Sequence, residues 1–192
     1  MKEQYTRAME LYRDWNSRIN VISRKDMDNI WEHHFLHSLA IARYRPFEPG
    51  ETVLDVGCGG GFPGIPLAIE FPDTQFTLCD SVGKKIKVAS AVAEGLGLGN
   101  VVTVNARAES LDGCWDWVVS RAVTTLDNFY PWVRGRFRKG ILCLKGGDVL
   151  AEVSQLCRKC HLDPSLVTVW PISSVYEDEY FREKFVIHIG KI

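Results

Sequence analysis

The hydrophobic pattern changes near residue 50, and beyond that point two kinds of segment alternate along the chain. One kind is a short apolar run, which predicts a strand; these runs lie near 52–56, 75–80, 101–105, 116–120 and 140–145. The other kind has apolar residues at helical spacing, and these segments lie near 63–71, 83–97, 126–135 and 147–161. Strands that alternate with helices predict a mostly parallel sheet with helices on both faces, which is a Rossmann-like α/β fold.

Both ends of the chain depart from this alternation. Apolar positions predict a helix from residue 2 to about 15, and a second helix that begins after Ser23 or Asp26 and stops before Arg45. Two β-rich runs follow the last helix, and we expect them to add antiparallel strands at the edge of a seven-stranded sheet. These runs are 166–170 and 184–189.

We predict a single domain over residues 1–192, because no repeat or linker divides the chain. Within it, residues 1–46 form an N-terminal helical extension and residues 47–192 form the Rossmann-like core.

Composition fits an ordinary globular domain. The 192 residues carry a net charge of −1, and 46% of them are hydrophobic. The lack of a long uncharged apolar run predicts no transmembrane helix, and the polar N-terminus predicts no signal peptide. Six cysteines without a secretory signal favour a reducing cytoplasm over a disulfide framework. The near-neutral charge disfavours a broadly basic nucleic-acid-binding protein but is compatible with a local basic patch.

The most informative motif is a glycine-rich turn after the first predicted strand. Asp55 precedes glycines at 57, 59 and 61, and a helical pattern follows. Glycine lets the backbone turn tightly and approach a ligand, and the helix start directs free N–H groups toward it. A dinucleotide-binding fingerprint, typical of an NAD-dependent oxidoreductase, would need glycine where the chain has Phe62. The acid suits a cationic ligand with an α-amino group, and the turn resembles motif I of the class I S-adenosylmethionine-dependent methyltransferases.

Residues after the other strands are candidates for the same site, because ligands bind outside the carboxyl ends of such strands. Asp80 can accept hydrogen bonds from two ribose hydroxyls, and the alternative is a cap on the next helix. Residues 105–109 can contact an adenine edge or form a solvated turn. Arg121 can orient a carboxylate, and the alternative is a salt bridge with Asp55 or Glu109.

Several segments together resemble the glucose-inhibited division protein B family, the bacterial 16S ribosomal RNA guanine-N7 methyltransferases. The resemblance covers nearly the whole chain, and Gly61-Phe62-Pro63-Gly64-Ile65-Pro66 is its most specific part. The chain departs from the family at His37, where an Asp is usual, and its N-terminus is shorter than in most members. The other matching segments are Trp15-Asn16, Ile19 to Ser23, His34 to Leu39, Leu78 to Ser81, Gly83-Lys84-Lys85, Arg107-Ala108-Glu109, Val119 to Ala122 and Leu144-Lys145-Gly146.

The resemblance implies methyl transfer from S-adenosylmethionine to N7 of one guanosine in the 16S rRNA of the 30S ribosomal subunit. Guanine N7 has a lone pair and no proton, so we expect no general base, and no catalytic side chain is assigned. Position by position, the resemblance implies cofactor contacts at Gly57, Phe62, Ala108, Glu109 and Arg121, and Asp80 matches its ribose-binding acid. The glycine turn adds Gly59 to the predicted cofactor contacts.

RNA binding needs cations for phosphates and flat side chains for bases. Lys145 at a strand end beside the cleft, Arg121 and Lys84 are the predicted RNA contacts. The basic stretches 84–87 and 134–139 either contact phosphates or form solvated faces. The aromatic residues near the second stretch either stack on a base or belong to the core, and these are Tyr130, Trp132 and Phe137.

Two other patterns are typical of metal or haem sites, and we expect neither group. Cys157, Cys160 and His161 match C-x-x-C-H, but no export signal or later methionine accompanies them. His33 and His37 have the spacing of metal ligands, but no carboxylate motif completes a set. We predict a cytoplasmic monomer that acts on rRNA without a membrane. The remaining alternatives are a non-catalytic S-adenosylmethionine- or nucleotide-binding RNA-interaction module, and methylation of a small molecule or protein.

Overall fold

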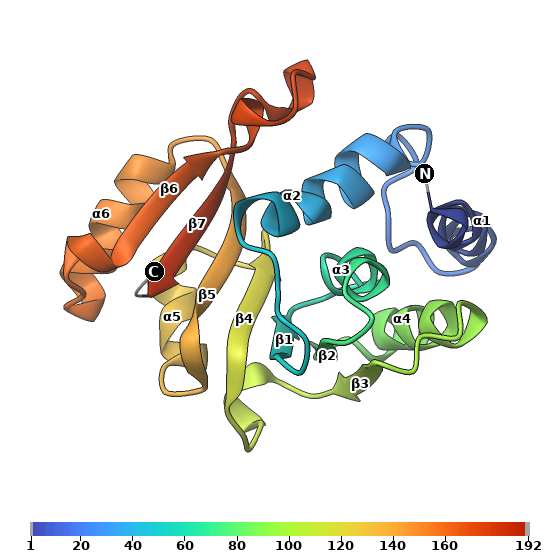
Figure 1. Ribbon diagram of the computed structural model, residues 1–192, viewed down its shortest axis with the longest axis horizontal. Coiled ribbons are helices and arrows are strands. Elements are labelled where there is room, and N and C mark those ends of the chain that lie inside the picture. The colour runs from blue at the N-terminus through green and yellow to red at the C-terminus, as the bar shows by residue number, and fades with distance from the viewer. Residues whose placement is uncertain (1, 191–192) are drawn as a thin grey trace.

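A seven-stranded sheet forms the centre of the protein, as a computed structural model describes it over residues 2–190 (Figure 1). Its strand order is β3-β2-β1-β4-β5-β7-β6, and β1 to β5 run parallel to one another. The predicted Rossmann-like sheet is confirmed. The strands are β1 (Thr52–Val56), β2 (Gln75–Asp80), β3 (Val101–Asn105), β4 (Trp115–Arg121), β5 (Phe137–Gly146), β6 (Val167–Pro171) and β7 (Lys184–Gly190).

Helices cover both faces of the sheet (Figure 1). Helices α2, α3 and α4, with α1 packed outside them, bury apolar side chains on one face, whereas α5 and α6 bury the other. The α-helices are α1 (Glu3–Asn16), α2 (His37–Tyr44), α3 (Gly64–Glu70), α4 (Gly83–Gly95), α5 (Leu126–Val133) and α6 (Val149–Cys160). The shorter segments are the π-helix η1 (Trp31–Leu36) and the 3₁₀-helices η2 (Ala108–Ser110), η3 (Pro164–Leu166), η4 (Ile172–Ser174) and η5 (Glu179–Phe181).

The last two strands lie at the sheet edge and pair through antiparallel ladders, as predicted. β7 lies between β5 and β6 and runs antiparallel to each, so β6 runs in the same direction as β1 to β5. The connections explain this. Helix α6 carries the chain back across the sheet before β6 begins, whereas residues 172–183 contain only short 3₁₀-helices and reverse the chain directly into β7.

The second helical segment begins at Trp31, later than the sequence predicts. Ser23 and Asp26 form a turn of their own instead: the Asp26 N–H donates to the Ser23 carbonyl over 3.0 Å, and the Ser23 hydroxyl donates to the Asp26 carboxylate over 2.7 Å. Such local side-chain bonds compete with helix formation, so the polar residues that were expected to start the helix close a turn before it.

Asn16 fastens the end of α1 to the segment that follows. Its Oδ1 accepts from the N–H groups of Val21 and Ile22 over 2.8 and 2.9 Å, and its Nδ2 donates to the Ile22 carbonyl over 2.9 Å. Ile22 is buried in the core, and the Val21 side chain packs against Gly60, because a Cβ placed on Gly60 would lie 2.8 Å from it. One amide side chain thus positions the N-terminal extension over the glycine turn.

Replacing Asn16 with alanine will lower the free energy of unfolding by roughly 3 kcal/mol, because three hydrogen bonds worth about 1 kcal/mol each are lost. Urea unfolding at neutral pH measures the loss. Asn20→Ala, at an exposed position of the same segment, is the matched control and will change stability by less than about 0.5 kcal/mol. Equal stabilities of the two variants would contradict the role given to Asn16.

Candidate active site

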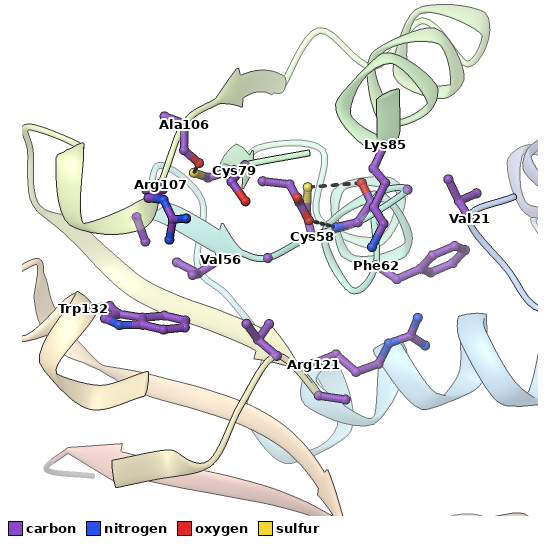
Figure 2. A pocket seen from close by; sticks show the side chains of 18 of the residues that line it. Val21, Val56, Cys58, Phe62, Cys79, Lys85, Ala106, Arg107, Arg121 and Trp132 are labelled. Carbon is purple, nitrogen blue, oxygen red and sulfur yellow. Dashed lines mark hydrogen bonds between the residues drawn. The ribbon is translucent and has the colours of Figure 1, made fainter. Parts of the chain in front are cut away.

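A cavity of about 430 Å³ lies at the carboxyl ends of β1 to β4 (Figure 2). The segments that follow these four strands line it, as the topology of an open parallel sheet requires. All seven residues that the sequence predicts to bind the cofactor lie in its lining, although their role in binding stays a prediction. They are Gly57, Gly59, Phe62, Asp80, Ala108, Glu109 and Arg121.

The turn between β1 and α3 needs its glycines for backbone geometry. Gly57, Gly59 and Gly61 have φ of +69°, +56° and +114°, a region that side chains with a Cβ rarely adopt. A Cβ on Gly59 would meet no atom within 4 Å, so this part of the turn faces open space in the cavity. The N–H groups of Gly57 and Cys58 donate to the Cys79 carbonyl over 2.8 and 3.1 Å, which ties the turn to the end of β2.

Asp80 connects the glycine turn to the start of α4. Its Oδ2 accepts from the Gly59 N–H over 2.9 Å and its Oδ1 from the Val82 N–H over 2.8 Å. The expected alternative, a role at the next helix start, is therefore present, and the same carboxylate also lines the cavity. Because each carboxylate oxygen accepts about two hydrogen bonds, each keeps room for a ligand hydroxyl.

Asp55 lies beneath the turn rather than in the cavity lining. The side chain is fully buried, and its Oδ2 accepts from the Gly64 N–H over 2.8 Å at the start of α3. Its Oδ1 has no partner among residues 2–190. Burial raises the pKa of Asp55 to about 7, although the Gly64 hydrogen bond and the Arg121 charge oppose the rise. Asp55 therefore supports the turn from below, outside the cavity lining, and its expected effect on a cationic ligand stays a prediction.

Arg121 is held by backbone and histidine rather than by an acid. Its guanidinium donates to the His33 carbonyl over 3.2 Å and lies 3.0 Å from His34 Nδ1, and it lies 5.1 Å above the Phe62 ring. Burial and the Arg121 charge lower the pKa of His34 to about 3. Because a guanidinium only donates, His34 Nδ1 is the acceptor and the ring is neutral. The alternative of a salt bridge from Arg121 to Asp55 or Glu109 is not what the structure has.

A second cavity, of about 690 Å³, shares Arg121, Ala122 and Val123 with the first. Ala122 has φ of +50°, so the chain turns sharply between the two cavities. Lys145, a predicted RNA contact, lines the second cavity from the end of β5. Its ammonium is bound to the Glu152 carboxylate over 2.6 Å and to the Thr124 carbonyl over 2.5 Å. Lys145 therefore fastens the turn after β4 as well as lining the cavity.

His37, the position at which the family usually has Asp, is buried at the base of the second cavity. Its Nδ1 lies 3.3 Å from the Tyr180 hydroxyl, and its ring packs edge-on against Tyr180 and Phe181. Burial lowers the pKa of His37 well below its usual value, with the Arg121 charge acting in the same direction. A neutral imidazole thus fills the place at which an acid was expected.

Further residues without a predicted cofactor role also line the first cavity, and three of them come from segments outside the strand ends and the glycine turn: Val21, Lys85 and Trp132. Figure 2 shows Trp132 and Lys85 on opposite sides of the cavity. Helical spacing favours a core position for Trp132, and Lys85 belongs to the stretch 84–87, which the sequence leaves open between phosphate contact and a solvated face. The only signal for Val21 was its place in a segment that resembles the family. Lys84, the predicted RNA contact beside Lys85, is exposed and lies outside the lining of both cavities.

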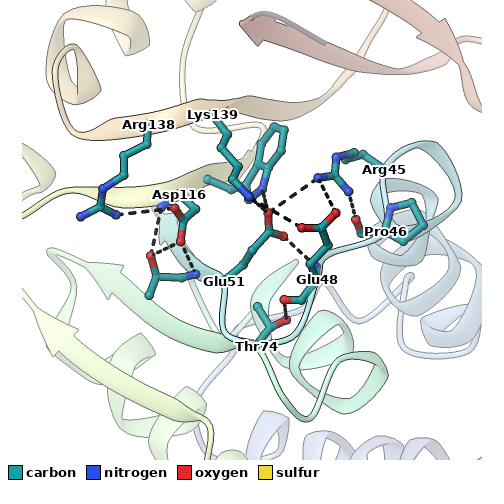
Figure 3. A network of polar contacts seen from close by, with 10 residues as sticks. Arg45, Pro46, Glu48, Glu51, Thr74, Asp116, Arg138 and Lys139 are labelled. Carbon is teal, nitrogen blue, oxygen red and sulfur yellow. Dashed lines mark hydrogen bonds and ion pairs between the residues drawn. The ribbon is translucent and has the colours of Figure 1, made fainter.

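The basic stretch 134–139 leads into the start of β5, and its last two residues make ion pairs at the amino ends of the strands, opposite the two cavities. Glu51 is buried there and accepts from Lys139 over 2.6 Å and from the Trp117 indole over 3.0 Å (Figure 3). Arg45 lies 3.6 Å from the same carboxylate, and Arg138 lies 3.7 Å from Asp116. Arg138 and Lys139 thus neutralise acids at the amino ends of the strands, away from the two cavities, which favours a structural role for these two residues. Arg136 of the same stretch donates to the Glu109 carbonyl over 2.8 Å.

The residues of the two metal- or haem-like sequence patterns make other contacts in the structure. Cys157 and Cys160 are free thiols in α6, and His161 ends that helix with φ of +53°. His33 pairs with Asp26 over 3.0 Å, whereas His37 faces Tyr180. Over residues 2–190, no group of three or more His, Cys, Asp or Glu side chains is arranged to hold a metal ion. The helices of the same part of the chain include none that is long and apolar enough to cross a membrane.

The sheet order, the glycine turn and the cavity at the strand ends define a class I S-adenosylmethionine-dependent methyltransferase fold. Solved structures agree on the fold. An S-adenosylmethionine-dependent methyltransferase from Aquifex aeolicus matches with a TM-score of 0.62 at 14% identity, covering 89% of this chain and 100% of the other. A ribosomal protein L11 methylase from Lactobacillus delbrueckii subsp. bulgaricus matches with a TM-score of 0.62 at 17% identity, covering 82% and 77%.

The chain belongs to the rRNA small subunit methyltransferase G family, whose model matches residues 1–175. A relative named ribosomal RNA small subunit methyltransferase G from Flavobacterium johnsoniae is 47% identical over 195 residues, covering 97% of this chain and 90% of the relative. The protein of the same name from Porphyromonas gingivalis is 48% identical over 197 residues, covering 98% and 86%. The resemblance seen in the sequence is confirmed.

Proposed function

We propose that this protein transfers a methyl group from S-adenosylmethionine to N7 of one guanosine in 16S rRNA. The observation that carries the proposal is the pair of cavities that meet at Arg121, Ala122 and Val123. The first has the residues of a class I cofactor site, and the second adjoins it at the point where a methyl group would pass. The family assignment supports rRNA as the substrate.

The first cavity fits S-adenosylmethionine. Asp80 has an acceptor site left on each carboxylate oxygen for the ribose hydroxyls, and the backbone at Gly59 faces open space. Ala108 and Glu109 lie at the start of η2, beside Trp132, where an adenine ring would contact both backbone and an aromatic face. Arg121 has three N–H groups beyond those bound to His33 and His34, and these can hold the amino-acid carboxylate.

The mechanism asks for positioning rather than proton transfer. When bound, the cofactor supplies an electrophilic methyl group. The N7 lone pair of guanine would form the new bond to the methyl carbon as the methyl–sulfur bond breaks and S-adenosylhomocysteine leaves, and N7 carries no proton for a general base to remove. Holding N7 in that line provides several kcal/mol of the rate enhancement. Arg121, which His33 and His34 hold in place, lies in the wall that the two cavities share and so fixes the position of one cavity relative to the other.

Neutral histidines suit this chemistry. The methylated base carries a positive charge, and a protonated ring beside it would oppose its formation. Burial holds the pKa of His34 at about 3 and that of His37 well below its usual value, so both rings are uncharged at neutral pH. His34 and His37 therefore add no positive charge against the reaction.

Lys145→Ala will lower kcat/KM for RNA by about tenfold and leave the Kd for S-adenosylmethionine unchanged. The variant removes the ammonium that holds the Thr124 carbonyl and leaves Glu152 without its ion pair at the wall of the second cavity. Methylation kinetics and calorimetry measure the two quantities. Arg158→Ala, at an exposed position of α6, is the control. A weakened affinity for the cofactor would contradict the placement of Lys145 outside the first cavity.

The proposed function is tested by transfer of a tritiated methyl group from S-adenosylmethionine to 30S subunits from a strain that lacks the modification. The expected product is 7-methylguanosine at a single position of 16S rRNA; naked 16S rRNA in parallel shows which form is the substrate. Binding of the cofactor with no transfer to either form would favour a non-catalytic RNA-interaction module instead. We further propose that the protein is cytoplasmic, which the six free cysteines and an rRNA substrate support, and that it acts as a monomer.

A further inference from the structure

The second cavity extends away from the first along the sheet edge. β5 lies on the side of β4 opposite β1, and Arg121 on β4 is in register with Leu144 on β5. Lys145 follows Leu144, and Glu152 on α6 binds Lys145. The Lys145–Glu152 pair therefore forms the wall of the second cavity beyond Arg121, on the side away from the cofactor site.

The positions of Arg121 and of the Lys145–Glu152 pair in the second cavity match the N7 edge and the Watson–Crick edge of a guanine base. N7 must face the shared wall at Arg121 to Val123, because the methyl group comes from the first cavity. The Watson–Crick edge, with its N1–H and N2–H donors, adjoins the edge that carries N7, and its N2 amino group is the exocyclic group farthest from N7. A guanine with N7 at the shared wall therefore extends its N2 amino group away from the cofactor site, toward the side that the Lys145–Glu152 pair lines.

Glu152 has the chemistry that this edge requires. Both of its hydrogen bonds use Oε1, which accepts from the Leu126 N–H and from Lys145 Nζ over 2.6 Å each. Its structural role at the start of α5 thus uses one oxygen and leaves Oε2 available at the cavity. A carboxylate oxygen accepts from N1–H and N2–H of guanine, whereas adenine presents a lone pair at N1 that a carboxylate repels.

Two other polar side chains of this cavity already have partners. Asp26, its second carboxylate, accepts from the Ser23 hydroxyl at Oδ2 and pairs with His33 at Oδ1. Tyr180 has His33 stacked at 3.9 Å on its ring and Lys184 Nζ at 5.1 Å from the ring centroid. His34 Nε2 and His37 Nε2 in the same lining have no partner among the described residues, but His34 accepts at Nδ1 and so carries its proton on Nε2, which cannot accept from N1–H or N2–H. Glu152 Oε2 is the carboxylate oxygen in the described lining that has no hydrogen bond.

We propose that the second cavity holds the target guanine and that Glu152 selects it by accepting hydrogen bonds from its Watson–Crick edge. The proposal rests on the proposed function and adds to it the residue that determines base specificity. It assigns Glu152 a contact with substrate, distinct from the positioning of Arg121 and Lys145.

Small subunits reconstituted with 16S rRNA that carries inosine at the methylated position test the proposal, because inosine keeps N7 and N1–H but lacks the N2 amino group. Wild-type protein will methylate guanosine with about 10- to 100-fold higher kcat/KM than inosine, the range for one hydrogen bond to a charged group. In Glu152→Gln, which keeps an oxygen for Leu126, this ratio will fall to about one, with S-adenosylmethionine affinity unchanged. Glu177→Gln, at an exposed position, is the control and will keep the wild-type ratio.

A wild-type ratio near one would overturn the proposal without any variant, so a folding defect in Glu152→Gln cannot hide its failure. A Glu152→Gln protein that keeps the wild-type ratio would overturn it as well. Failure of the proposed function is distinct: wild-type protein would then bind S-adenosylmethionine but transfer no methyl group to the guanosine subunits, and the proposal for Glu152 would fall with it.

Discussion

Asp80→Ala will raise the Kd for S-adenosylmethionine by at least about 100-fold. The carboxylate is expected to accept hydrogen bonds from two ribose hydroxyls, and each bond to a charged group contributes about 1.5–3 kcal/mol. The substitution also releases the Gly59 N–H, which Asp80 holds over 2.9 Å, so the glycine turn loses its tie to the start of α4. Isothermal titration calorimetry with S-adenosylmethionine and with S-adenosylhomocysteine measures the change.

Asp80→Asn separates the two effects. An amide oxygen can keep one backbone contact, so the turn is retained while the charge and one acceptor are lost, and an intermediate affinity is expected. Asp73→Ala, at an exposed position before β2, will leave affinity unchanged. Affinity of Asp80→Ala within threefold of wild type would place the ribose elsewhere and remove the main support for the cofactor site.

Asp55 will make the protein less stable as pH rises from about 4 to 7. Its pKa is raised to about 7 in the folded state, from an ordinary value of 3.8, chiefly by burial. The folded state therefore binds more protons than the unfolded state between these values. The contribution of the group is full below its unfolded pKa and is lost as pH rises through the folded pKa. A shift of this size corresponds to a loss on the order of 4 kcal/mol.

The comparison of wild type with Asp55→Asn isolates this effect. Asparagine keeps an acceptor for the Gly64 N–H but does not titrate. His34 and His37, whose pKa values are lowered in the folded state, act with the opposite sign, because their protonation in the unfolded state lowers stability as pH falls. Both proteins contain them, so they cancel in the difference. Urea unfolding from pH 4 to 8 will show wild type losing stability relative to the variant as pH rises.

Asp112→Asn, at an exposed position, supplies the flat reference curve for this comparison. A difference between wild type and Asp55→Asn that stays constant across the same pH range would show that Asp55 is ionised in the folded protein. The acid beneath the turn would then be a charged support, and the argument from its burial would be wrong.

The cofactor side of the site could be predicted because it follows strand ends. An open parallel sheet brings the residue after each strand to one edge, so Asp80, Ala108 and Arg121 could be placed together without coordinates. The glycines of the turn could also be interpreted from the sequence, because glycine is the residue that most easily adopts the positive φ angles found there. The position of a site residue could therefore be predicted wherever it depends on a single strand and the turn that follows it.

Residues that reach the cavities across elements could not be predicted in the same way. Trp132 lies on α5 and Glu152 on α6, and their helical spacing looks the same whether they face a core or a cavity. Val21 reaches the glycine turn because Asn16 folds the segment after α1 back on itself. The position of β7 between β5 and β6 depends on how a non-helical connection reverses the chain, and the hydrophobic pattern does not specify it.

The most direct test of the account is a crystal structure of the protein with S-adenosylhomocysteine. The account predicts the ligand in the cavity at the carboxyl ends of β1 to β4, with its ribose hydroxyls on Asp80, its adenine beside Ala108 and Trp132, and its sulfur directed toward the shared wall at Arg121. Density for the ligand at any other place, or a ribose without contact to Asp80 at saturating ligand, would contradict it.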